Sequence, residues 1–148
     1  GFHTVYADGA EFEIGKGVLL QDGKDVTILA SGVMVAEALD AAELLRKDGI
    51  GARVIDLHTW KPLDEAMVLQ AAAETGCIVT AENHQVFCGL GSAVANLLCR
   101  NRPVPIEFIG IQNRYGQVGS QDFLLQEYGM TAGHIRDAAL RAIRRKKA

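Results

Sequence analysis

Short runs of apolar residues alternate along this chain with longer segments in which apolar residues recur at helical spacing. Each run is too short and too uniformly apolar for an exposed sheet, so it predicts a strand covered on both faces. The predicted buried strands are residues 26–30, 52–57, 77–81 and 105–110. The segments that follow them predict helices over residues 35–48, 64–76, 89–101, 120–128 and 131–147.

The ends of these helices carry local signals. Asp64, Ser120 and Thr131 stand where a side chain caps the first turn of a helix, and Gly49 and Gly76 stand where a helix ends. Such signals make the helix positions more definite than the apolar spacing alone.

Alternating strands and helices predict an α/β fold, a three-layer α/β/α sandwich around a mostly parallel sheet. Right-handed crossovers place helices on both faces of such a sheet. A further apolar run at 17–20 leads through the turn-like residues 21–24 directly into the strand at 26–30. So short a connection predicts an antiparallel neighbour, which makes a five-stranded mixed sheet with its first strand antiparallel. Residues 1–16 have no lasting period and predict a linker that arrives from an upstream domain.

Composition and charge fit a soluble globular domain. The chain has 148 residues and a formal net charge of −3, which gives no general electrostatic basis for binding nucleic acid or a membrane. Residues 141–147 are rich in Arg and Lys, which suits the solvated C-terminus of a helix. No apolar run approaches the roughly 20 residues of a membrane span. The three cysteines match no zinc or redox pattern, which predicts reduced core residues in a cytoplasmic protein.

The polar residues that follow two predicted strands form the candidate site. Because ligands of open α/β sheets bind beyond the carboxyl ends of strands, we expect these residues to form a crest that contacts a ligand or a neighbouring domain. The residues of the crest are Ser31, Gly32, Glu82, Asn83, His84, Gly89, Gly91 and Ser92. No nucleophile accompanies them and no spacing matches a metal site, so we assign no catalytic residue and no metal ligand.

Two interpretations of the crest remain open. Glu82 beside His84 has the groups for acid–base work, but the two groups can equally satisfy each other or nearby backbone. Gly89 and Gly91 open a helix after a strand, as in a phosphate-binding loop, although Val94 occupies the place of a third glycine. Close packing of the helix on the strand explains the same glycines. His58 and Trp60 favour a packing or interface surface.

Four stretches, in this order and spacing, resemble the C-terminal domain shared by transketolases, 1-deoxyxylulose-5-phosphate synthases and the β subunits of 2-oxoacid dehydrogenases. They are residues 25–32, residues 54–57 with Lys61-Pro62-Leu63-Asp64, residues 80–84 with Gly89-Leu90-Gly91, and residues 124–131. These motifs are most similar to the C-terminal section of split bacterial transketolases. The chain departs from the family at Cys88 and at Asn113-Arg114-Tyr115, where a glycine and an acidic residue are common.

The resemblance implies that residues 17–148 are a transketolase C-terminal domain, which on its own does no chemistry. In the parent enzyme, thiamine diphosphate and Mg are expected on the upstream domains or subunit, with none on this chain, and a homodimer is expected. The parent would transfer ketol units between sugar phosphates, and this domain would serve assembly and regulation. Two alternatives remain: a domain of a 2-oxoacid dehydrogenase E1 β subunit, and a stand-alone module that binds a small ligand.

Overall fold

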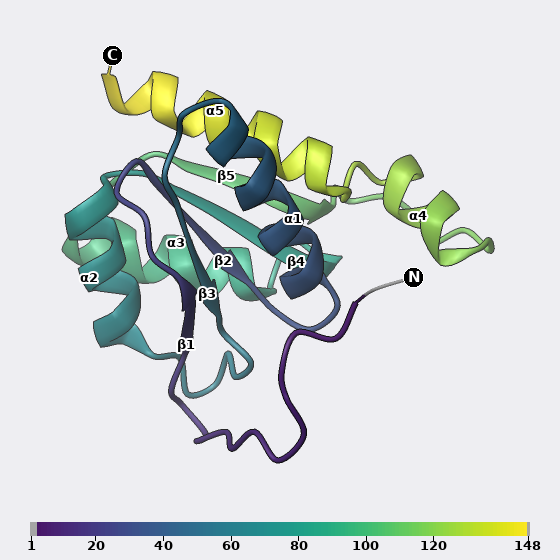
Figure 1. The fold of residues 1–148 in the computed structure, drawn as a ribbon, viewed down its shortest axis with the longest axis horizontal. Coiled ribbons are helices and arrows are strands. Elements are labelled where there is room, and N and C mark those ends of the chain that lie inside the picture. The colour runs from purple at the N-terminus through teal and green to yellow at the C-terminus, as the bar shows by residue number, and fades with distance from the viewer. Residues whose placement is uncertain (1–2, 148) are drawn as a thin grey trace.

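The computed structural model describes residues 3–147 as one α/β domain of five strands and five helices (Figure 1). The strands are β1 (Val18–Gln21), β2 (Val26–Ala30), β3 (Ala52–Asp56), β4 (Ile78–Gln85) and β5 (Ile106–Ile111). The helices are α1 (Met34–Lys47), α2 (Glu65–Thr75), α3 (Leu90–Asn101), α4 (Gln121–Glu127) and α5 (Ala132–Lys147). Every strand and helix that the apolar pattern predicts is present.

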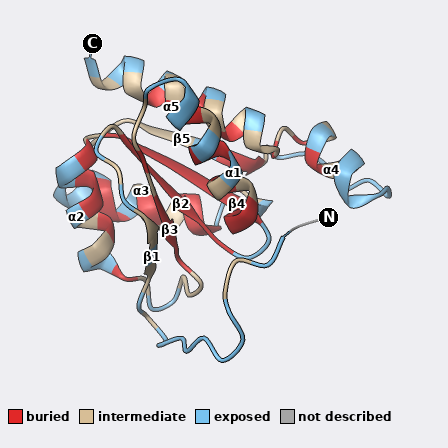
Figure 2. Cartoon of the chain, in the orientation of Figure 1, coloured by how far each residue is buried: buried red, intermediate tan, exposed pale blue. Residues whose placement is uncertain are grey.

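The strands form a single mixed sheet in the order β1-β3-β2-β4-β5, in which β1 is antiparallel to β3 and the other neighbours are parallel. One face packs against α1 and α5, and the other face packs against α2 and α3. Within β2, Ile28 belongs to the first of these cores and Leu29 to the second. Figure 2 shows the resulting buried layer of strands between the helices. The predicted three-layer sandwich is therefore confirmed.

The first strand is antiparallel, as expected, but its neighbour is β3 and not the β2 strand that follows it. Both sides of β2 are already paired, with β3 and β4. The chain after β1 therefore passes the start of β3, so closely that a Cβ on Gly23 would lie 2.4 Å from the carbonyl carbon of Ala52. Asp25 fixes this crossing, because its carboxylate accepts from Gly51 N at 2.7 Å.

Two of the three predicted caps are present. Asp64 accepts from Met67 N at 3.1 Å, and Ser120 accepts from Phe123 N at 3.3 Å. At the start of α5, the Thr131 hydroxyl is instead paired with Nδ1 of His134 at 2.7 Å. The first backbone N–H of α5 donates to Glu37 of α1 at 2.6 Å, so a distant carboxylate helps to satisfy this helix end.

The segment before β1 contains no helix or strand within residues 3–17, yet it is held against the domain. The Tyr6 hydroxyl donates to Asp56 Oδ2 at 2.7 Å, and the Phe12 ring meets the His58 ring edge-on at 5.1 Å. Further along, Gly15 N donates to the Thr59 hydroxyl at 2.8 Å. Residues 1–2 of the predicted linker lie outside the described residues. The linker assignment itself remains a prediction.

The cysteine prediction holds for one residue of three. Cys77 is buried, whereas Cys88 and Cys99 are exposed, and all three are free thiols. Cys99 lies on the outer side of the amphipathic helix α3, and Cys88 lies in the loop before that helix. In the part of the chain that the structure describes, no helix is long and apolar enough to cross a membrane.

Candidate functional site

The parallel strands end along one edge of the sheet, and the crest residues lie there. The strand order reverses between β2 and β4. From β2 the chain continues to β3 on one side of this boundary, and from β4 it continues to β5 on the other side. Such a reversal of strand order is where α/β sheets usually bind ligands. The crest therefore occupies the expected position in the fold.

The structure separates the crest into buried and accessible members. Ser31, Glu82, Gly89 and Gly91 are buried, and Ser92 is half-buried. The exposed members are Gly32, Asn83 and His84. The sequence pattern ended the strand at residue 81, but β4 continues to Gln85, so Glu82, Asn83 and His84 lie within the strand. The pairing of β4 with β5 is irregular between Ala81 and Gln85, and the side chains of this stretch do not simply alternate: Glu82 is buried, whereas Asn83 and His84 are both exposed.

Glu82 uses its carboxylate inside the domain. The side chain is completely buried, and its two oxygens accept from Leu90 N at 2.7 Å and from Gly91 N at 2.9 Å. These N–H groups belong to the first turn of α3, which has no other side-chain cap. A bound phosphate would need the same donors. The anion at this helix end is therefore the protein's own carboxylate.

The two glycines of the α3 entry are explained by this contact. A Cβ on Gly89 would lie 1.9 Å from Glu82 Oε2, and a Cβ on Gly91 would lie 2.7 Å from Cδ1 of Phe108 and 2.9 Å from the Thr80 hydroxyl. All three distances are shorter than real Cβ contacts. Close approach of α3 to β4 and β5 is a sufficient reason for glycine at both positions.

The carboxylate–imidazole pair is not arranged for acid–base chemistry. His84 Nδ1 lies 3.9 Å from Glu82 Oε2 and makes its short contact, 2.7 Å, with the carbonyl oxygen of Gln85. Burial raises the pKa of Glu82, although the N–H groups of Gly91 and Leu90 oppose this shift. A carboxyl group with no exposed surface cannot exchange protons directly with a bound substrate.

Four further residues lie at the same edge, and the sequence did not assign them to the crest. Asp56 ends β3 with 5% of its surface exposed; Tyr6 satisfies its Oδ2, while its Oδ1 has no hydrogen-bond partner in the described chain. Burial raises the pKa of Asp56. The Trp60 ring meets the His84 ring edge-on at 5.7 Å, and His58 packs on Phe12. The sequence does contain a signal for Asp56, because it is an acidic residue at the end of a buried apolar run. It contains no such signal for Tyr6.

A hollow of about 300 Å³ opens at the boundary between β2 and β4. It lies among α4, the start of α1 and the end of β4, and its lining contains no charged residue. The lining residues are Val33, Asn83, Gly119, Gln121, Leu124, Leu125 and Met130. Of the crest, Asn83 contributes to this hollow.

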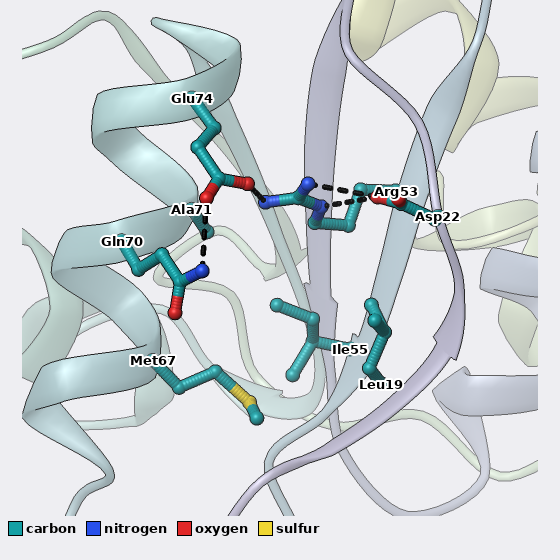
Figure 3. Close-up of a pocket in the computed structure, with 8 residues that line it drawn as sticks. All are labelled: Leu19, Asp22, Arg53, Ile55, Met67, Gln70, Ala71 and Glu74. Carbon is teal, nitrogen blue, oxygen red and sulfur yellow. Dashed lines mark hydrogen bonds and ion pairs between the residues drawn. The ribbon is translucent and has the colours of Figure 1, made fainter.

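A second hollow of about 300 Å³ lies away from the crest, between α2 and the β1–β3 pair (Figure 3). Arg53 crosses it, donating to Asp22 at 2.7 Å and pairing with Glu74. The hydrogen bond from Arg53 lowers the pKa of Asp22. Since the Arg53 guanidinium is paired with both carboxylates, we interpret the hollow as a structural ion network between helix and sheet.

Comparison with known proteins defines the family. The family model described as "Transketolase, C-terminal domain" matches residues 15–135, which is most of the chain. The chain belongs to the transketolase C-terminal domain family. The resemblance inferred from the ordered motifs is thereby confirmed.

Members of this family with named functions include subunits of split transketolases. The 6-deoxy-6-sulfo-D-fructose transketolase subunit SqwH of Clostridium sp. (strain MSTE9) is 51% identical over 142 residues, which cover 96% of this chain and 44% of that protein. An apulose-4-phosphate transketolase subunit of Phocaeicola vulgatus is 40% identical over 138 residues, which cover 93% of this chain and 44% of that protein.

A solved structure titled as a split gene transketolase in an inactive beta4 tetramer superposes with a TM-score of 0.94. It is 42% identical, and the match covers 99% of this chain and 48% of that one. The chain thus spans less than half the length of these relatives. This transketolase C-terminal domain has the fold of a split transketolase subunit over its full described length.

The residues of this domain do not fit thiamine diphosphate with its metal. Within residues 3–147 there is no group of three or more His, Cys, Asp or Glu side chains that could hold a metal ion. The N-terminus of α3, which follows the Gly89 turn, is filled by the Glu82 carboxylate, whose charge would repel a diphosphate. No step of the cofactor's chemistry can therefore be assigned to these residues.

Proposed function

We propose that this chain is the C-terminal domain of a subunit of a split, transketolase-like enzyme that transfers ketol units between sugar phosphates. The parent enzyme would act in the cytoplasm as a dimer and use thiamine diphosphate and Mg on its upstream domains or on a partner subunit. This domain would contribute assembly and support, without a catalytic residue of its own.

One observation carries the proposal: the chain aligns over 96% of its length with a transketolase subunit, yet spans 44% of that subunit. A domain that is retained so completely in a subunit more than twice its length is expected to work beside the remaining part. The chemistry of the crest supports this role, since the Glu82 carboxylate is committed to α3 and no nucleophile stands beside it.

The test is a calorimetric titration with thiamine diphosphate and Mg²⁺. We expect saturable binding by the complete enzyme, assembled from the full-length subunit and its partner, and no saturable binding by the 148-residue chain. Saturable binding by the chain alone would overturn the assignment of the cofactor to upstream domains. Ketol transfer is tested on the complete enzyme with a ketose phosphate donor and an aldose phosphate acceptor; an inactive but cofactor-loaded enzyme would contradict it.

A further inference from the structure

Apolar side chains are exposed on the loop between β5 and α4. Tyr115 is 99% exposed and Val118 is 101% exposed, so neither side chain packs against the domain. Phe123, on α4, is 48% exposed, and Val33, at the start of α1, is 40% exposed. Val33 lines the hollow at the β2–β4 boundary together with Gly119 of this loop, which places the two segments side by side.

The loop that carries these side chains is held in place from its ends. Gln85 clamps it with two hydrogen bonds, accepting from Asn113 N at 2.9 Å and donating to the carbonyl oxygen of Arg114 at 2.9 Å. The Tyr128 hydroxyl donates to the carbonyl oxygen of Tyr115 at 2.9 Å.

Arg114 and Glu127 fix the same loop to α4. The Arg114 guanidinium donates to the Glu127 carboxylate at 2.6 Å and lies over the Tyr128 ring, 5.2 Å from its centroid. The Gln117 side chain donates to the same carboxylate at 3.2 Å. Polar contacts thus order the backbone of a loop whose apolar side chains point into solvent. Preorganised, exposed aromatic and aliphatic side chains are the usual anchors of protein–protein interfaces.

We propose that the loop face, defined as Val33, Tyr115, Val118, Phe123 and the hollow beside them, is the surface on which the upstream half of the parent subunit docks. This inference rests on the proposed function. The hollow has no charged residue in its lining, so it fits an apolar protein surface with amide or backbone hydrogen bonds better than a phosphorylated ligand.

The identity of the occupant follows from chain length and position. The chain spans 44% of each named transketolase subunit and 48% of the split transketolase chain, so these relatives hold at least as much chain again. In Figure 1, α4 projects beyond the sheet at one end of the molecule, and the first described residues of the chain (purple) lie on that same side. An upstream domain would therefore join the chain on the side where the loop face is exposed.

Site-specific photocrosslinking in the full-length parent subunit tests this docking. A benzophenone amino acid replaces Tyr115 in one sample and Lys24 in another, and crosslinked peptides are identified by mass spectrometry. Lys24 is the matched control, because it is exposed in the turn at the opposite edge of the sheet. We expect crosslinks from position 115 to upstream residues of the same subunit, several-fold above the yield from position 24. Crosslinks from position 115 to a second copy of this domain or to another protein would overturn the proposal. A yield from position 115 no higher than that from position 24 would also overturn it.

A second variant guards against misfolding as an explanation. Val118→Asp introduces a charge at a fully exposed position, so the stability of the 148-residue chain should not change. In the full subunit, cleaved within residues 7–13, the same variant should release this domain several-fold faster than the unchanged sequence. Equal release rates would contradict docking through the loop face. If the upstream coding region encodes no thiamine-diphosphate-binding domain, the proposed function fails; if it does and the crosslinks fall elsewhere, the docking surface alone fails.

Discussion

Glycine 91 offers a direct test of the contact between α3 and the sheet. It is the second residue of α3, and an alanine methyl group there would lie 2.7 Å from Cδ1 of Phe108 and 2.9 Å from the hydroxyl of Thr80. The Thr80 side chain is completely buried, and its hydroxyl has no partner in the described chain. Gly91→Ala therefore forces a methyl group into a space that the strands already fill.

Two effects of opposite sign determine the result. Alanine gains up to about 1 kcal/mol over glycine within a helix. Overpacking a closed contact costs about 1–3 kcal/mol. Because the methyl group would press on buried side chains of β4 and β5, we expect overpacking to win, with a net loss of up to roughly 2 kcal/mol.

Gly133 provides the matched control, because it is the second residue of α5 and is exposed. A methyl group at that position would meet nothing closer than 3.7 Å, and the backbone is in an ordinary helical region. Gly133→Ala should therefore stabilise the chain by about 0.5–1 kcal/mol through helix propensity alone. The same substitution at equivalent helix positions thus has opposite expected signs.

Urea unfolding followed by circular dichroism measures both variants, and thermal unfolding gives a second readout. For a chain of this size, 1 kcal/mol corresponds to roughly 2–4 °C in melting temperature. If Gly91→Ala proved as stable as Gly133→Ala, close packing would not explain the glycine, and a role for this turn in binding would have to be reconsidered.

Two further predictions concern the buried carboxylates. Since burial raises the folded-state pKa of Glu82 above its ordinary value of 4.5, ionisation weakens the fold. Urea titrations at several pH values give the unfolding free energies of the unchanged chain and of Glu82→Gln. The stability of the unchanged chain relative to the variant should fall as the pH rises above about 4.5. A difference that rises with pH would mean that the N–H groups of α3 outweigh burial. Tyr6→Phe leaves the buried Asp56 without its hydroxyl donor and should destabilise the chain by about 1–3 kcal/mol in the same assay. Tyr115→Phe, which removes a fully exposed hydroxyl, is its control, and equal effects of the two would refute a structural role for the Tyr6 contact.

Much of the fold follows from local sequence pattern. Apolar runs locate every buried strand, and signals such as Asp64 locate helix ends, because burial on both faces and capping depend on nearby residues. The partner of β1 could not be obtained in this way. The turn at 21–24 is short enough for a hairpin, and only the pairing of β2 with β3 and β4 excludes that arrangement.

The candidate site was predictable in position and less so in its interactions. Strand ends indicated where the crest residues gather, since parallel strands end at one edge. The commitment of Glu82 to α3 depends on how closely that helix approaches β4, which no local pattern encodes. Tyr6 reaches Asp56 from a segment without periodicity, so this contact is a property of the tertiary structure alone.

The pairing of β1 with β3 has a consequence for synthesis on the ribosome. β1 leaves the ribosome before its partner does, and β2 and α1 lie between them in the chain. The apolar strand Val18–Gln21 therefore remains without a pairing partner until β3 has emerged. Because unpaired strands are prone to aggregate, nascent chains that pause before residue 56 would be the most dependent on chaperones.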